Sequence, residues 1–128
     1  MSLRESLRIM VVDDMSTSRG LILQALEAIG VNHVTSASGG QDAIDAIRVS
    51  PVHLVISDFN MPGMDGIQLL ERIRQDCATQ RLGFIIVTGR ADQQILIRGQ
   101  PLGLNNLIEK PFSAIEMKTC IERVGGRL

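Results

Sequence analysis

The stretch Val52-His-Leu-Val-Ile-Ser57 is a mostly apolar run of strand length, and Asp58 follows it directly. Such a run is typical of a strand that is buried on both faces of a parallel sheet. Four further runs of similar character occur along the chain, of which the second is the weakest. They cover residues 8–12, 32–36, 84–87 and 106–108. We therefore predict five strands, with the run at 52–57 third in order.

Segments with helical periodicity separate these runs. Residues 16–29 place apolar side chains on one helical face, and Gly30 is the expected C-cap. A capping-box pattern at Ser38 predicts a second helix that extends to about Val49 and is stopped by Pro51.

Three further helices are predicted in the second half of the chain. Asp65 has N-cap character, a short helix is expected over 91–99, and Ser113 begins a second capping-box pattern. The side chains expected to face the core are Ile22, Ala25, Leu26 and Ile29 in the first helix, Ile67, Leu70 and Ile73 in the third, and Ile115, Cys120, Ile121 and Val124 in the last.

The alternation of five strands with five helices predicts an α/β fold with a parallel sheet. Crossovers between parallel strands are right-handed, so helices should cover both faces. We expect a flavodoxin-like (βα)5 arrangement with strand order 2-1-3-4-5. Residues 1–128 are expected to form a single domain whose core spans 8–124. In this architecture ligands bind outside the carboxyl ends of the strands, where the strand order reverses.

Composition excludes several classes of function. The chain has 128 residues and a formal net charge of −1, without Trp or Tyr and with three Phe. A nucleic-acid-binding domain usually carries excess positive charge, and many stack bases on aromatic side chains, so we expect no nucleic-acid partner. No apolar run approaches the roughly 20 residues that a membrane span needs. We expect a cytoplasmic monomer in which Cys77 and Cys120 are reduced.

Acidic residues stand at the ends of two predicted strands. Asp13 and Asp14 follow the first strand, and Asp58 ends the third. These strands are neighbours in the expected order, so the three carboxylates should converge. Like charges held so close raise one another's pKa values or require a cation. A hard divalent ion with oxygen ligands, Mg²⁺ above all, suits such a site.

Further polar groups reach the same edge of the sheet. Thr88 follows the fourth strand and Lys110 the fifth, where a compact ammonium could pair with a carboxylate or a phosphoryl oxygen. The backbone carbonyl of Asn60 could bind a metal, whereas Asp65 is better interpreted as a helix cap than as a fourth ligand. Pro111 indicates a rigid turn after the lysine, with a cis peptide bond as one option.

Together these residues resemble the receiver domain of two-component response regulators. The resemblance rests on Asp13-Asp14, the loop Asp58-Phe-Asn-Met-Pro-Gly-Met-Asp-Gly66, Thr88 and Lys110-Pro111. It implies that Asp58 accepts a phosphoryl group from a sensor histidine kinase. The implied Mg²⁺ ligands are Asp14, Asp58 and the Asn60 carbonyl, with Asp13 acting mainly through water. Lys110 and Thr88 would contact the phosphoryl group, and the chain would signal rather than act as an enzyme, although it would catalyse its own phosphorylation and dephosphorylation.

One position departs from the family's pattern. Receivers usually carry an aromatic residue three positions before the lysine, and Leu107 stands there. Thr88 and Leu107 would form the switch, but leucine offers no hydroxyl and less area than tyrosine. Two jobs remain open: chemotaxis output on a flagellar motor switch protein, or a phosphate sink or relay step toward a histidine phosphotransfer protein. A phosphatase is a further possible partner.

Two other classes of protein fit the sequence less well. A phosphohydrolase of the haloacid-dehalogenase type needs a second aspartate two residues after its nucleophile, where Asn60 stands. A flavodoxin-like redox carrier needs a phosphate-cradling loop after the first strand and aromatic residues around the flavin. Asp13 and Asp14 would repel that phosphate, and the chain has neither Trp nor Tyr.

Overall fold

Five parallel strands form one sheet in the order β2-β1-β3-β4-β5, as the sequence predicts. The structure is a computed structural model that describes residues 6–90 and 92–125. The order reverses between β1 and β3, so their carboxyl ends lie side by side. The strands are β1 (Arg8–Val12), β2 (His33–Ala37), β3 (Leu54–Asp58), β4 (Gly83–Thr88) and β5 (Asn106–Glu109).

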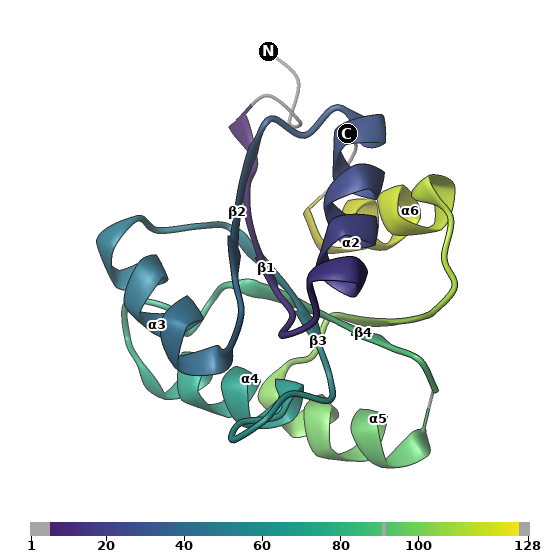
Figure 1. The fold of residues 1–128 in the computed structure, drawn as a ribbon. Helices are drawn as coiled ribbons and strands as arrows, with labels where there is room; N and C mark the ends of the chain where they lie inside the picture. The colour runs from purple at the N-terminus through teal and green to yellow at the C-terminus, as the bar shows by residue number, and fades with distance from the viewer. Residues whose placement is uncertain (1–5, 91, 126–128) are drawn as a thin grey trace.

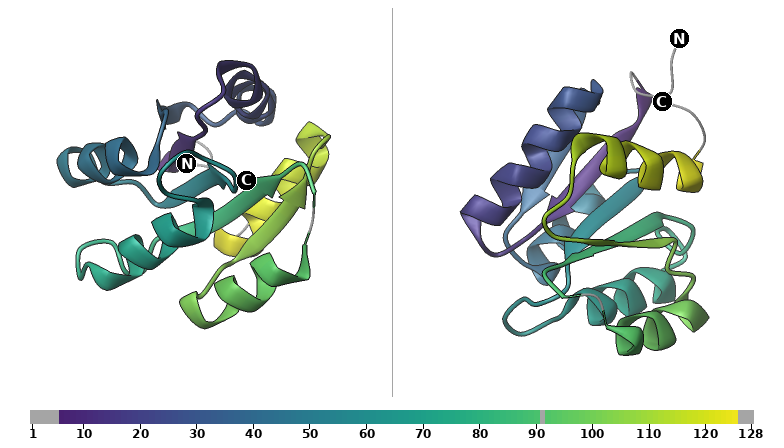
Figure 2. Two further views of the ribbon diagram at one scale, coloured as in Figure 1. Left: turned by 60° about the horizontal axis from the view of Figure 1, so that its bottom comes forward. Right: turned by 90° about the vertical axis from the view of Figure 1, so that its right-hand side faces the viewer.

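Helices cover both faces of the sheet, and they divide two against three (Figures 1 and 2). One face carries α2 (Ser16–Ile29) and α6 (Ala114–Gly125), and the other carries α3 (Gly40–Val49), α4 (Gly66–Gln75) and α5 (Gln93–Gly99). The short 3-10 helix η1 (Gln100–Leu102) follows α5 directly and contains Pro101. Of the predicted helix over 91–99, residue 91 lies outside the described residues.

Each face of the sheet has its own apolar core. Alternate residues of β1 divide between them, with Ile9 and Val11 on the α2–α6 side and Met10 and Val12 on the other. The buried side chains are almost entirely aliphatic, and Phe84 is the largest of them. The central strands β3 and β4 are buried along their whole length, which fixes the positions of the residues at their carboxyl ends.

The predicted helix signals are confirmed in three places. Gly30 ends α2 in the left-handed conformation, with φ 96°. Asp65 caps α4 in a capping box with Gln68. Ser113 and Glu116 form the same reciprocal pair before α6.

Two predictions were wrong. Ser38 makes no cap, because α3 begins at Gly40 with Gly39 as its N-cap, and the Ser38 hydroxyl reaches only the Asp42 carboxylate, 3.5 Å away. Ile115 is 77% exposed, because α6 turns Met117 into the core instead. The remaining predicted core residues of the last helix are buried or partly buried, namely Cys120, Ile121 and Val124.

Among the described residues, no helix is long and apolar enough to cross a membrane. Both cysteines are free thiols, with Cys77 exposed and Cys120 buried.

Candidate functional site

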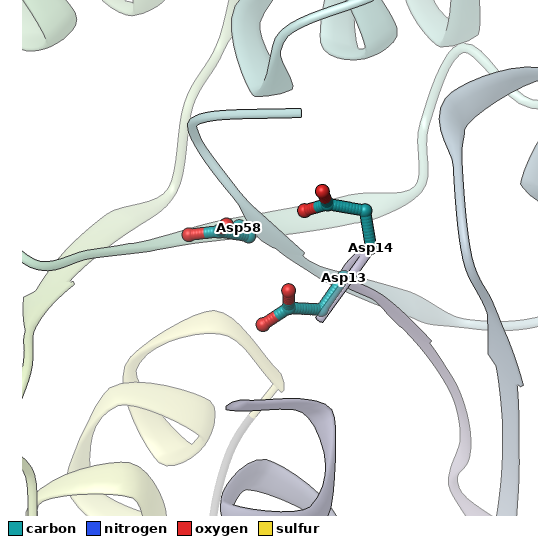
Figure 3. Close-up of side chains that lie close together, drawn as sticks. All are labelled: Asp13, Asp14 and Asp58. Carbon is teal, nitrogen blue, oxygen red and sulfur yellow. The ribbon is translucent and has the colours of Figure 1, made fainter. Parts of the chain in front are cut away.

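Three carboxylates meet where β1 and β3 end (Figure 3). Asp13 and Asp14 lie just beyond β1, and Asp58 is the last residue of β3. One oxygen from each lies within 4.8 Å of the others. Asp13 and Asp58 are buried and Asp14 is exposed. The sequence therefore predicted correctly that these three side chains converge.

Burial and repulsion between like charges disfavour the ionised form of Asp58 in this cluster. Burial, and after it the neighbouring Asp13 carboxylate, raise the pKa of Asp58, and the lowering effect of Lys110 does not offset them. The Oδ1 of Asp13 accepts a hydrogen bond from the Met15 amide, 3.0 Å away. Its buried Oδ2 has no hydrogen-bond partner among the described residues. A buried carboxylate oxygen that accepts no hydrogen bond, beside two more carboxylates, fits a hard divalent ion with oxygen ligands.

Lys110 brings the opposing positive charge to the cluster. It follows β5, and its backbone N–H donates to the Thr88 carbonyl at 2.8 Å. Its Nζ lies 3.3 Å from Oδ1 of Asp58 and 3.8 Å from Oδ2 of Asp13. The Lys110–Pro111 peptide bond is cis. Because Nζ of Lys110 lies 3.3 Å from Asp58, an anion placed on Asp58 would have an ammonium within reach.

Thr88 is the last residue of β4. The neighbouring strand β3 ends at Asp58, which is paired with Val87, the residue before Thr88. The side chain is 2% exposed. Its hydroxyl donates to the Arg90 carbonyl at 3.2 Å and accepts from the Arg90 N–H at 3.3 Å. To donate a hydrogen bond to a group on Asp58, the hydroxyl would have to give up its bond to the Arg90 carbonyl.

The loop after Asp58 is held close to β3 by a glycine. The N–H of Gly66 donates to the Phe59 carbonyl at 2.8 Å. A Cβ on Gly66 would stand 2.7 Å from the Asp58 carbonyl oxygen, so a larger residue cannot pack there without displacing the loop. Gly63 has φ 80°, a conformation that favours glycine, and Asn60 is exposed.

Comparison with known proteins agrees with this geometry. The model of a family described as response regulator receiver domain matches residues 9–122. The chain is a response regulator receiver domain. A "Probable chemotaxis protein CheY" of Rhizobium etli is 43% identical over 128 residues, which is 100% of this chain and 99% of that protein. Chemotaxis protein CheY-3 of Vibrio cholerae is 33% identical and covers 98% and 97% of the two chains.

Solved receiver structures have the same fold. Chemotaxis protein CheY4 of Vibrio cholerae superposes with a TM-score of 0.85 at 23% identity, over 92% of this chain and 98% of that one. A response regulator receiver domain protein from Clostridium thermocellum gives 0.81 at 28% identity, over 92% and 93%. Receivers of this kind are signalling proteins rather than classical enzymes. They are phosphorylated by a histidine kinase, act on a downstream target and typically bind a divalent metal at an acidic pocket.

Leu107 is the residue predicted to form the switch together with Thr88. It lies in β5, paired with Ile86 of β4, and is half-buried against the core under α3, α4 and α5. On that side of the sheet, the α5 residues Leu96 and Ile97 are largely exposed.

Sequence reasoning missed two residues that contact the predicted site, both in the first turn of α2. The Arg19 guanidinium donates to the Asp13 carbonyl at 2.7 Å. The Ser18 hydroxyl lies 2.6 Å from Nζ of Lys110. Their place one turn after Asp13-Asp14 was the available signal, since the start of a helix that follows a strand lies at the same sheet edge.

Proposed function

We propose that Asp58 is the phosphoryl acceptor of this receiver and that its phosphorylation changes which partner the domain binds. The observation that supports this most directly is the convergence of Asp13, Asp14 and Lys110 on the buried Asp58 carboxylate. A carboxylate with a cation site on one side and an ammonium on the other suits the transfer of a phosphoryl group.

The transfer is a substitution at phosphorus. A carboxylate oxygen of Asp58 attacks the phosphorus of a phosphohistidine on the kinase, and a new P–O bond forms. The P–N bond breaks, and its electron pair returns to the imidazole nitrogen. The product is an acyl phosphate on Asp58, which an in-line water later hydrolyses to regenerate the carboxylate.

The metal is proposed to be Mg²⁺. Asp14, Asp58 and the backbone carbonyl of Asn60 would bind it directly, and Asp13 mainly through water. When bound, the ion neutralises charge on the phosphoryl oxygens. The chain's own contribution is to hold the carboxylates at the ends of two buried strands, so that the acceptor does not reorganise during transfer.

Lys110 is proposed to pair with the phosphoryl group, since its Nζ already lies 3.3 Å from Asp58. Thr88 would turn its hydroxyl from Arg90 toward the same group. This rotation would carry the signal from the site to the rest of the sheet. Leu107 lies on the adjacent strand, paired with Ile86 two positions before Thr88, and is proposed to respond to it.

We propose chemotaxis signalling as the biological role, with a flagellar motor switch protein as target. The names of the Rhizobium etli and Vibrio cholerae relatives, which align over almost the whole chain, support it. Leu107 in the aromatic position favours a second candidate, in which the domain is a phosphate sink or passes phosphate to a histidine phosphotransfer protein.

The acceptor is tested by incubating the protein with acetyl phosphate and Mg²⁺ and measuring intact mass. The wild type should gain one phosphoryl group, and Asp58→Asn should gain none. Asp45→Asn, which removes an exposed aspartate on α3, is the matched control and should be labelled normally. Labelling of Asp58→Asn at another residue to the same extent would refute the assignment.

The role is tested by retention on three immobilised partners, with and without beryllofluoride as phosphoryl mimic. Mimic-dependent retention on a motor-switch peptide supports the chemotaxis output. Retention only on the kinase or on a histidine phosphotransfer domain supports the sink or relay.

A further inference from the structure

In the described part of the chain, three side-chain oxygens contact the Lys110 ammonium, and the nearest does not belong to a carboxylate. Its Nζ lies 2.6 Å from Oγ of Ser18, against 3.3 Å from Asp58 and 3.8 Å from Asp13. A charge-assisted N–H···O bond to a carboxylate normally measures about 2.7–2.9 Å. Both ion pairs are longer than that. The ammonium is therefore drawn toward Ser18 of α2 and away from the two carboxylates.

Electrostatic attraction alone does not explain why the Lys110 ammonium lies beside the start of α2. Ser18 is the third residue of α2, and the first turn of a helix carries the positive end of its dipole, which repels a cation. The two carboxylates attract the ammonium in the other direction. The Ser18 hydroxyl oxygen is the acceptor that outweighs this, and it joins the β5–α6 loop to α2, which lies beside α6 (Figure 1).

We propose that Ser18 is a positioning residue that holds Lys110 ready for the phosphoryl group. This rests on the proposed function, in which Asp58 is phosphorylated. With Ser18 in place, Nζ makes only a long hydrogen bond of 3.3 Å to Oδ1 of Asp58, so the carboxylate keeps an oxygen available to attack. The ammonium is then already beside the place where phosphoryl charge appears.

Loss of the hydroxyl releases a flexible four-carbon side chain. The ammonium then either closes on Asp58 and occupies the acceptor or samples positions away from it. Both outcomes slow phosphorylation by a small donor. Neither outcome requires α2 to be destabilised. Ser18 is only half-buried and lies in the first turn of the helix.

The first test is the initial rate of labelling by acetyl phosphate. Ser18→Ala should be slower by about tenfold, the size expected for one hydrogen bond to a charged group. Ser18→Thr, which keeps a hydroxyl, should stay within about twofold of the wild type. Thr17→Ala removes an exposed hydroxyl from the same turn and should not slow labelling.

The second test separates a positioning role from a structural one. In a Lys110→Ala background, Ser18→Ala should cause no further loss of rate, because Ser18 acts only through the lysine. An equal loss in both backgrounds would overturn the proposal, as would a Ser18→Ala protein labelled at the wild-type rate.

The third test does not depend on phosphorylation. The chain has only two lysines, Lys110 and Lys118, so a ¹⁵N spectrum of lysine ammonium groups contains two signals. The Lys110 signal should be protected from solvent exchange in the wild type and in Ser18→Thr, and broadened in Ser18→Ala, with Lys118 unchanged as internal reference. An unaltered Lys110 signal in Ser18→Ala would refute the positioning role. A protected signal in a wild type that acetyl phosphate cannot label would refute the acceptor assignment instead.

Discussion

Oδ1 of Asp58 lies 3.3 Å from Nζ of Lys110, across 52 residues of sequence. The contact joins the end of β3 to the loop after β5, on opposite sides of β4 in the sheet. It reduces the repulsion between Asp58 and Asp13 without cancelling it, because burial and Asp13 still raise the pKa of Asp58. The negative charge of Asp58 therefore destabilises the folded protein when no metal ion is bound.

Asp58→Asn should stabilise the metal-free protein at neutral pH. The substitution removes a buried charge whose cost exceeds the gain from its pairing with Lys110. We expect a gain of about 1 kcal/mol in the free energy of unfolding, or a few degrees in Tm. Urea or thermal unfolding in the presence of a chelator measures it.

The stabilising effect of Asp58→Asn should depend on pH. A carboxyl whose pKa is raised in the folded state contributes stability below its unfolded pKa, and loses it as pH rises through the folded value. The advantage of Asp58→Asn should therefore disappear below about pH 4, where Asp58 is protonated in both states. An advantage of equal size at acid and neutral pH would show that charge is not its cause.

Magnesium should stabilise the wild type through the same cluster. A ligand that binds only the folded state adds RT ln(1 + [L]/Kd), which is about 1.4 kcal/mol at ten times Kd. Asp14→Asn should lose most of this gain, because Asp14 is the exposed member of the cluster and a proposed direct ligand. Asp45→Asn should keep it. A gain equally large in Asp14→Asn would place the ion elsewhere.

The sheet and the acidic cluster were predictable because both depend on local pattern. Buried strands read as apolar runs, and polar residues directly after them must reach the carboxyl edge. Asp65 and Ser113 were predicted as caps for the same reason, since a capping box joins residues three apart. The cap predicted at Ser38 was wrong, because α3 begins at Gly40 and its N-cap is Gly39.

The contacts that tune the site were not predictable in this way. The hydroxyl of Ser18 meets Lys110 across 92 residues, and no periodicity encodes which rotamer a lysine adopts. Ile115 was assigned to the core by apolarity alone, whereas the packing of α6 on α2 selects Met117. Such choices are made when two faces pack, and they need the structure.

Thr88→Ala should separate phosphorylation from signalling. The Thr88 hydroxyl makes its hydrogen bonds to the Arg90 backbone, so labelling by acetyl phosphate should stay within a few-fold of the wild type. The effect of beryllofluoride on the amide NMR signals of β5 and α5 should shrink. Serine at this position keeps the hydroxyl and should restore the response, and a full response in Thr88→Ala would contradict the proposed switch.

Gly66→Ala and Gly20→Ala should change stability in opposite directions. A Cβ on Gly66 would stand 2.7 Å from the Asp58 carbonyl oxygen and 3.2 Å from Cα of Phe59, both of them backbone atoms that cannot move aside cheaply. We expect a loss of about 1–3 kcal/mol and slower labelling of Asp58, because the acceptor loop is displaced. Gly20 lies within α2 with open space around it, so alanine should add about 0.5–1 kcal/mol through helix propensity. Urea unfolding of the two variants beside the wild type decides the matter, and a Gly66→Ala protein as stable and as readily labelled as the wild type would show that the loop does not depend on this close approach.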